Sequence, residues 1–280
     1  MLRSPVIVID PDRDHGELVA AILDAAGVDA IVVESDHAVE RAPWPGAEQR
    51  REAIARTIRT GAFRTVFQPM VALYKSEVVG YEALTRFDDG TRPDQWFVDA
   101  NALGLGTDLE LATIASAVDA ARCLPAGRFV TINLGPELLL SRRDELKAAI
   151  RDLLDDRPVV LELTEHDVIE DYEALRANLA ALGPHVQLSV DDAGAGFSTL
   201  RHVVMLEPEY VKLDRSWVND IHIDPTRQAL VAGLSHFART TGCELVAEGI
   251  EAELERATLE DLDVSLGQGF LLGAPGGVDR

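Results

Sequence analysis

Two short segments of the chain place acidic and basic side chains close to the ends of apolar runs. The segment Tyr81–Arg86 combines a carboxylate with an arginine, and Asp191–Gly196 begins with two adjacent carboxylates and continues into a glycine-rich turn. Other apolar runs also end in polar residues, namely Asn133, Glu162, Lys212, Glu248 and Gln268. So many carboxylates directed at one place would repel one another unless cations held them there. The pattern therefore predicts a metal-dependent enzyme that acts on a phosphate ester.

The composition limits the size of the fold and the kind of partner. The chain has 280 residues, enough for one large domain and a small appendage, and carries a net charge of −22. This charge repels nucleic-acid backbone and anionic lipid, so we expect no DNA or RNA polymer as a partner. A small phosphorylated ligand, held by metal ions and a few basic side chains, is compatible with it. No apolar run approaches the roughly 20 residues that span a bilayer, which predicts no membrane insertion.

The first residues and the two cysteines favour a cytoplasmic location. Residues 1–5 lack the apolar core and cleavage site of a signal peptide. Cys123 and Cys243 lie in apolar segments that we expect to be helical. Two buried free thiols fit a reducing cytoplasm better than a disulfide framework.

The first 45 residues are expected to form a small unit of their own. Residues 6–9 and 31–33 are short apolar strands, and Glu17–Ala26 has the apolar spacing of a helix. This order resembles the opening β-α-β of a response-regulator receiver domain, but the rest of that fold has no room before residue 60. We assign residues 1–45 to a receiver-like fragment and linker, and residues 46–280 to the main domain.

From about residue 62 apolar strands alternate with helices. Strands are expected at 66–70, 78–81, 128–134, 158–163, 186–190, 209–213, 244–247 and 264–266, and helices at 48–60, 93–102, 107–123, 137–155, 171–182, 198–206, 225–241 and 251–260. The spacing favours a parallel sheet, preceded by one antiparallel pair. The polar residues fall at the carboxyl ends of many strands, as in a barrel, whereas a doubly wound sheet would gather them at one switch point. We predict an α/β fold, a TIM-like (β/α)8 barrel with an early antiparallel strand, plus an N-terminal β-α-β appendage.

Eight motifs in chain order resemble those of the EAL-domain family. They are Phe67–Pro69, Gly80–Arg86, Ile132–Leu134, Glu162–Glu165, Asp191–Asp192, Val211–Asp214, Ala247–Ile250 and Gly267–Phe270. The resemblance runs from about residue 62 to residue 275. It implies a phosphodiesterase that hydrolyses cyclic di-GMP to the linear dinucleotide 5'-pGpG, and it implies a homodimer.

The resemblance also implies a site for two divalent ions, Mg²⁺ or Mn²⁺. Hard ions of this kind prefer carboxylate and amide oxygens, and a pair of them neutralises a phosphate and supplies hydroxide near neutral pH. The implied ligands of the first ion are Glu82, Asn133, Glu162 and Asp191. Asp191 would bridge to a second ion shared with Asp192. Adjacent aspartates can both face one site only if their strand stops there, which the following glycines permit.

The remaining motif residues receive catalytic, substrate-binding or supporting roles. Lys212 is expected to hydrogen-bond the attacking water and offset negative charge. Glu248 is expected either to ligate the second ion or to act as general base, and the sequence leaves these two roles open. Arg86 suits a substrate phosphate, because a guanidinium forms bidentate hydrogen bonds. The implied substrate-binding residues are Gln68, Leu84, Arg86 and Gln268, and the implied anchor of the loop 193–198 is Glu165, which holds the paired aspartates in register.

The loop after the paired aspartates departs from the family pattern. An aromatic residue is replaced by Ala193 and a hydroxyl-bearing residue by Ala195. Neither position is an expected metal ligand, so the complete ligand set favours an enzyme. The altered loop keeps an alternative open, in which the domain is catalytically weak or inactive and serves as a cyclic di-GMP sensor or interaction module.

Overall fold

A computed structural model of the chain describes residues 6–10, 30–34, 46–163, 169, 171–193 and 197–277. The chain divides into two compact units, Met1–Glu48 and Gln49–Arg280. In the first unit, β1 (Val6–Asp10) pairs in parallel with β2 (Ala30–Glu34). The two strands predicted there are thus confirmed. The helix predicted over Glu17–Ala26 lies outside the described residues.

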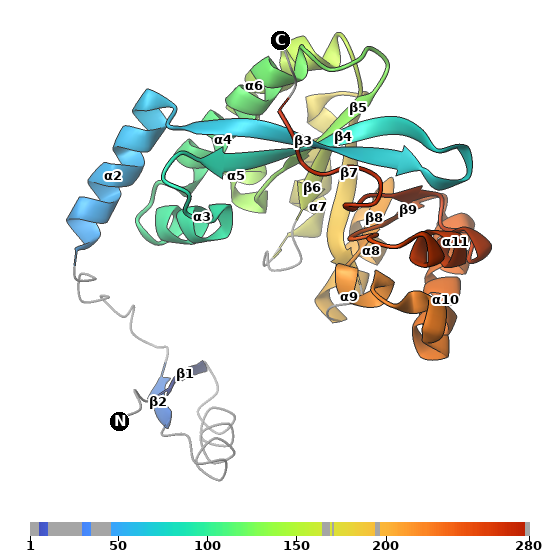
Figure 1. Ribbon diagram of the computed structural model, residues 1–280. Coiled ribbons are helices and arrows are strands. Elements are labelled where there is room, and N and C mark those ends of the chain that lie inside the picture. The colour runs from blue at the N-terminus through green and yellow to red at the C-terminus, as the bar shows by residue number, and fades with distance from the viewer. Residues whose placement is uncertain are drawn as a thin grey trace. The chain divides into compact units, whose positions relative to one another are not determined.

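The second unit is a closed barrel in the strand order β10-β3-β4-β5-β6-β7-β8-β9, with helices around it (Figure 1). Its strands are β3 (Phe63–Ala72), β4 (Glu77–Phe87), β5 (Phe129–Asn133), β6 (Val159–Leu163), β7 (Val186–Ala193), β8 (Tyr210–Leu213), β9 (Glu244–Ala247) and β10 (Leu266–Gly267). Neighbouring strands are parallel except for β3, which is antiparallel to both β4 and β10. The predicted (β/α)8 barrel with an early antiparallel strand is confirmed.

The direction of β3 follows from the short connection to β4. A single 3₁₀ turn, Leu73–Lys75, and Ser76 in the left-handed region with φ of 54° link the two strands. So short a link can join only antiparallel neighbours, because a parallel pair needs a crossover of a dozen or more residues. The other strands are separated by such crossovers, so their carboxyl ends meet at one rim of the barrel.

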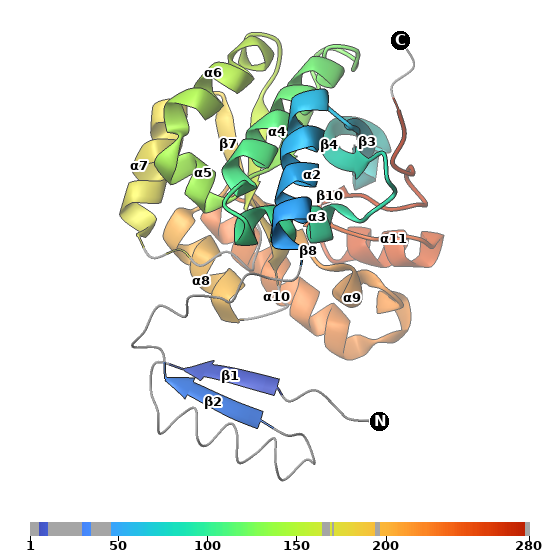
Figure 2. The same ribbon diagram turned by 90° about the vertical axis from the view of Figure 1, so that its left-hand side faces the viewer.

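Helices cover the outside of the barrel, most of them in the connections between its strands. They are α2 (Ala47–Thr60), α3 (Pro93–Ala102), α4 (Gly106–Ala121), α5 (Pro136–Ser141), α6 (Arg143–Leu154), α7 (Tyr172–Leu182), α8 (Phe197–Leu206), α9 (Arg215–Val218), α10 (Pro225–Thr241) and α11 (Glu253–Asp261), with a 3₁₀ turn at Ile221–Ile223. Figure 2 shows α4, α5, α6 and α7 side by side on one flank. Every residue of β6 is buried, because helices cover its outer face and barrel side chains its inner face. Among the described residues, no helix is long and apolar enough to cross a bilayer.

Several helix boundaries match the sequence prediction because strong capping residues mark them. The side chain of Asp224 accepts the amide N–H of Thr226 at 2.9 Å, and Pro225 occupies the first helical position of α10. The same helix ends at Gly242, whose φ of 83° suits a residue without a side chain. Asp171 caps α7 in the same way through Ala174.

One predicted helix, 137–155, is wrong as a single element. The structure has two helices, α5 and α6, separated at Arg142, whose φ of −135° leaves the helical region. The side chain of Arg142 there forms an ion pair with Asp108 at the start of α4. The apolar periodicity continues across the break, so the sequence pattern alone gave no sign of it.

The prediction that both cysteines are buried in helices is only partly confirmed. Cys243 is buried, but it lies in the connection between α10 and β9 and not in a helix. Cys123 is exposed in the turn that follows α4. Of the two cysteines that were expected to be buried, only Cys243 is.

A small aromatic cluster attaches α2 and α3 to the end of β4. Trp96 is 4% exposed, and its ring stacks on Phe87 with a centroid distance of 4.7 Å. The guanidinium carbon of Arg50 lies over the Trp96 ring, 4.3 Å from its centroid. The Nε of Arg50 forms an ion pair with a carboxylate oxygen of Asp99 at 2.7 Å. Trp96 is therefore a core residue.

We expect Gly269→Ala to destabilise the barrel by about 3 kcal/mol or more. A Cβ at position 269 would overlap the backbone nitrogen and oxygen of Ile250, which cannot rotate away. As a control, Gly233→Ala on the exposed face of α10, where a Cβ meets nothing within 4 Å, should stabilise by about 0.5–1 kcal/mol. Urea unfolding of the two variants measures both effects, and equal stabilities would contradict this account of Gly269.

Candidate active site

Four carboxylates from different parts of the barrel rim surround one buried ammonium group. The Nζ of Lys212 on β8 lies 3.5 Å from Glu82 of β4, 3.4 Å from Asp191 of β7 and 2.6 Å from Glu248. It also forms an ion pair with Glu162 of β6. Lys212 is 1% exposed and Glu162 is fully buried. The structure thus brings together five residues that the sequence predicted for one site. We call these five residues the acidic cluster.

The acidic cluster carries more negative than positive charge in a buried place. Burial raises the pKa of Glu162 well above its usual value, although Lys212 opposes this shift. Burial likewise raises the pKa of Glu248, to about 8. Burial alone would lower the pKa of Lys212, but the surrounding carboxylates raise it, so the ammonium stays charged. The ammonium of Lys212 can neutralise only one of the four carboxylates. Protons or further cations must offset the remaining negative charge.

Gln268 connects two members of the acidic cluster. It follows β10 directly, is 5% exposed, and donates its amide N–H groups to Glu82 at 2.7 Å and to Glu248 at 3.1 Å. Gln68, on the antiparallel strand β3, lies opposite Glu82 in the sheet register and donates to the backbone oxygen of Gly273 at 3.2 Å. Both glutamines were predicted to contact substrate or water. Their amides here bond to protein groups next to the cluster.

A cavity of about 560 Å³ opens beside the acidic cluster. The predicted substrate-binding residues Leu84 and Arg86 line it, together with the predicted metal ligand Asn133. Asn133 is exposed at the end of β5 and lies opposite Glu162 in the β5–β6 register, so the cavity adjoins the cluster. The Nη1 of Arg86 donates to the backbone oxygen of Thr85 at 2.9 Å, and among the described residues its other donors have no hydrogen-bond partner, so a ligand could accept from them.

The helix α4 supplies a polar residue of the cavity that the sequence analysis missed. Glu110 lines the cavity and accepts a hydrogen bond from the backbone N–H of Gly135. Asp94, Asn101 and Thr113 are further polar residues in the lining. Glu110 belongs to no motif and stands in the second turn of a helix, so only its position on the face of α4 that packs on the barrel could have indicated it.

The strand that carries the paired aspartates does not end where the sequence predicted. The strand β7 does not stop at Asp191 but continues to Ala193. Between Val190 and Ala193 the register shifts against β8, where Val190 pairs with Val211 and Ala193 with Leu213. The one extra residue is a β-bulge, which locally interrupts the pairing of β7 with β8. For Asp192 the structure describes the backbone within β7, and Glu165 and residues 194–196 lie outside the described part.

The donor set of the rim fits a hard divalent cation. Carboxylate oxygens and the amide oxygen of Asn133 are the ligands that such ions prefer. Within the described residues, Oε2 of Glu162 and Oε1 of Gln268 are buried without a hydrogen-bond partner. The described part of the chain has no three His, Cys, Asp or Glu side chains that converge as they stand on one ion. The carboxylates are arranged instead around the Nζ of Lys212.

The raised pKa values predict how stability depends on pH in chelator. The folded pKa of Glu248, about 8, exceeds its usual 4.5, so the folded protein holds a proton that the unfolded chain releases. The free energy of unfolding should therefore rise as the pH falls from about 9 to about 6, on the order of 1 kcal/mol per pH unit for each such group. Lys212 stays charged throughout this window and adds no slope.

Urea unfolding in EDTA at several pH values measures this slope. Glu248→Gln should reduce the slope, because the amide does not titrate. A wild-type protein that was more stable at pH 9 than at pH 6 would contradict the raised pKa of Glu248.

The barrel and its acidic rim define an α/β-barrel protein with a candidate site at the strand ends. The family model described as EAL domain matches residues 51–275, so the chain belongs to the EAL domain family. The chain is similar to the cyclic di-GMP phosphodiesterase RocR of Pseudomonas aeruginosa, 28% identical over 243 residues, which cover 79% of this chain and 59% of RocR. It is also 28% identical to the uncharacterized protein Rv1354c of Mycobacterium tuberculosis, over 79% of this chain and 38% of that protein. The chain thus spans less than two thirds of either relative.

A solved structure supports the same fold. BlrP1 of Klebsiella pneumoniae, in a complex with manganese and cyclic di-GMP, is 34% identical to this chain with a TM-score of 0.69. The alignment covers 77% of this chain and 56% of the BlrP1 chain.

Proposed function

We propose that this protein hydrolyses cyclic di-GMP to linear 5'-pGpG with the help of two divalent ions, Mg²⁺ or Mn²⁺. The observation that carries the proposal is the gathering of Glu82, Glu162, Asp191 and Glu248 beside a cavity that presents Arg86 and Asn133. Membership of the EAL domain family supports this, as do the name of RocR and the manganese and cyclic di-GMP bound in BlrP1.

The proposed ligands divide between two ions. We assign Glu82, Asn133, Glu162 and Asp191 to the first ion, and Asp191, Asp192 and Glu248 to the second. When bound, the ions would neutralise charge on the phosphate and lower the pKa of a bound water. Glu165 is proposed to hold the paired aspartates in place.

The side chains of the site have separate tasks in the proposed reaction. A water oxygen attacks phosphorus, the bond from phosphorus to the ribose 3' oxygen breaks, and that oxygen takes a proton from solvent. Glu248 is suited either to hold the second ion or to accept the proton of the water, since its carboxylate lies at the rim beside Lys212. Lys212 donates a hydrogen bond to the water and limits the repulsion between the carboxylates.

The cavity is proposed to receive the nucleotide. Arg86 would form bidentate hydrogen bonds with a phosphate, and Leu84 would pack against the substrate beside it. Gln68 and Gln268 are proposed to contact substrate or water once ions occupy the rim. We also propose a homodimer, and a division of the chain into a receiver-like fragment at 1–45 and the EAL domain at 46–280.

A second candidate is a cyclic di-GMP sensor that binds without hydrolysis. The replacement of an aromatic and a hydroxyl-bearing residue by Ala193 and Ala195 favours it, because the loop would hold the paired aspartates less firmly. Such a protein would signal through the N-terminal unit or through a change of oligomeric state.

Chromatography of the products distinguishes the two candidates. The purified chain is incubated with cyclic di-GMP in Mg²⁺ or Mn²⁺, and nucleotides are separated over time. Accumulation of the linear dinucleotide, blocked by EDTA, is the expected result. Saturable binding of cyclic di-GMP without any product would contradict the enzyme hypothesis and support the sensor hypothesis.

A further inference from the structure

The helix α4 contacts the segment that carries Asn133 through one carboxylate. Asn133 is the last residue of β5, and the next two residues lead into α5. The backbone N–H of Leu134 donates to the backbone carbonyl oxygen of Glu162 at 2.8 Å. The backbone N–H of Gly135 donates to the carboxylate oxygen Oε1 of Glu110. The two residues after Asn133 are thus each fixed to a different neighbour.

The contact between Glu110 and Gly135 is tight, so that a side chain at 135 would require the carboxylate to shift by a few tenths of an ångström. A Cβ built on Gly135 would lie 3.3 Å from each carboxylate oxygen of Glu110. Both oxygens therefore face the backbone of this turn. The same helix lines the cavity with Gly106, Thr113 and Ile114, so its position sets the cavity wall.

We propose that Glu110 is a positioning residue for Asn133 in metal binding, an inference that rests on the proposed function. Its carboxylate holds the turn at Gly135, and this turn sets the direction in which the amide of Asn133 enters the site. Without the carboxylate the backbone after β5 is fixed at Leu134 alone. The amide oxygen of Asn133 then samples positions away from the ligand set, which weakens binding of the ion. Residues that orient metal ligands typically change affinity by roughly 10–100-fold.

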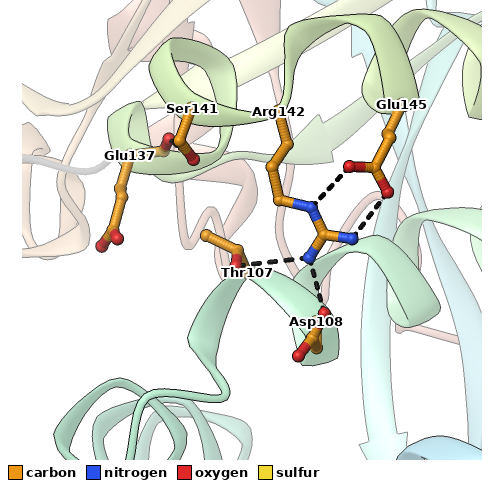
Figure 3. A network of polar contacts seen from close by, with 6 residues as sticks. All are labelled: Thr107, Asp108, Glu137, Ser141, Arg142 and Glu145. Atoms are coloured by element: carbon orange, nitrogen blue, oxygen red, sulfur yellow. Dashed lines mark hydrogen bonds and ion pairs between the residues drawn. The ribbon is translucent and has the colours of Figure 1, made fainter.

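A second contact attaches the same helix at a different point and provides a matched control. Figure 3 shows Arg142, between α5 and α6, reaching Asp108 at 2.6 Å and Thr107 at 3.4 Å while two of its nitrogens contact Glu145. This exposed arrangement also ties α4 to the α5–α6 segment, but it does not involve the turn at Gly135. Loss of the Arg142 contacts therefore loosens α4 without releasing that turn.

The test is calorimetric binding of Mn²⁺ to the chelator-treated full chain, without nucleotide. Glu110→Ala should weaken Mn²⁺ binding roughly tenfold, whereas Glu110→Gln, which keeps an oxygen acceptor for Gly135, should bind within about twofold of wild type. Arg142→Ala should lower the melting temperature and keep wild-type affinity. Gly135→Ala should weaken binding on its own but add nothing in the Glu110→Ala background, because the crowded carboxylate is gone.

Three results would overturn the proposal. Equal affinity of Glu110→Ala and wild type would show that the turn does not depend on Glu110. An equal loss in Arg142→Ala would assign the effect to loosening of α4 as a whole. If Glu110→Gln lost as much Mn²⁺ affinity as Glu110→Ala, Glu110 would act through its charge and not by positioning the turn. Because binding is measured without substrate, a chain that binds Mn²⁺ but hydrolyses nothing would contradict the proposed function and leave this inference supported.

Discussion

Replacing Glu82 by alanine should abolish hydrolysis of cyclic di-GMP and leave the fold intact. Glu82 is 6% exposed, contacts Lys212 and Gln268, and is a proposed ligand of the first ion. Loss of a ligand should lower turnover by about 10³-fold or more, since partners outside the ligand set already cost 10–100-fold. Stability should be unchanged or slightly increased, because the change removes one of four carboxylates gathered around one cation.

The variant is compared with Glu77→Ala, which changes an exposed glutamate at the start of the same strand. Initial rates in saturating Mg²⁺ and urea unfolding in EDTA give the two quantities. The control should match wild type in both. Near-normal turnover of Glu82→Ala would show that Glu82 is not a metal ligand. Unfolding of Glu82→Ala at a clearly lower urea concentration than wild type would show that Glu82 has a structural role.

Replacing Lys212 by methionine should be the most destabilising change in the acidic cluster. Lys212 is the ammonium that Glu82, Glu162, Asp191 and Glu248 share, and it is 1% exposed. Removing one partner of a buried ion pair typically costs about 3–5 kcal/mol, because it leaves uncompensated buried charge. We expect a loss of that size in EDTA near pH 8.

The origin of this loss can be tested by restoring positive charge in other ways. Lower pH should recover stability, because Glu162 and Glu248 have raised pKa values in the folded protein and take up protons that the unfolded chain does not hold. Mn²⁺ should also recover it by binding the folded state. Lys75→Met, at an exposed position, is the control and should match wild type at each pH and Mn²⁺ concentration. A destabilisation of Lys212→Met that neither protons nor Mn²⁺ relieved would assign Lys212 a packing role.

The barrel could be predicted from the sequence because local signals and the global fold agree. Apolar strands recur with helical segments between them, and residues such as Asp224, Pro225 and Gly242 mark helix ends through their own chemistry. The break at Arg142 could not be predicted in this way, since its cause is an ion pair with a helix that precedes it by more than thirty residues. Contacts of that range leave no periodic signal in the chain.

The acidic cluster could be predicted as a set but not in its arrangement. Strand-end positions indicated Glu162, Lys212 and Glu248, because the carboxyl ends of parallel strands share one rim. The central place of Lys212 depends on the geometry of several strands together, as does the bulge beside Asp191. Glu110 reaches the site from a helix, where neither motif nor strand position marks it.

Hydrolysis of cyclic di-GMP by this protein should depend on divalent ions held at the acidic cluster. Its most direct test is the initial rate of the chelator-treated protein as Mn²⁺ is added back, with the linear dinucleotide as the measured product. The account predicts no turnover in chelator and a rate that rises with Mn²⁺ more steeply than a single site allows. Turnover that persisted in chelator, or bound nucleotide that stayed cyclic at saturating Mn²⁺, would contradict it.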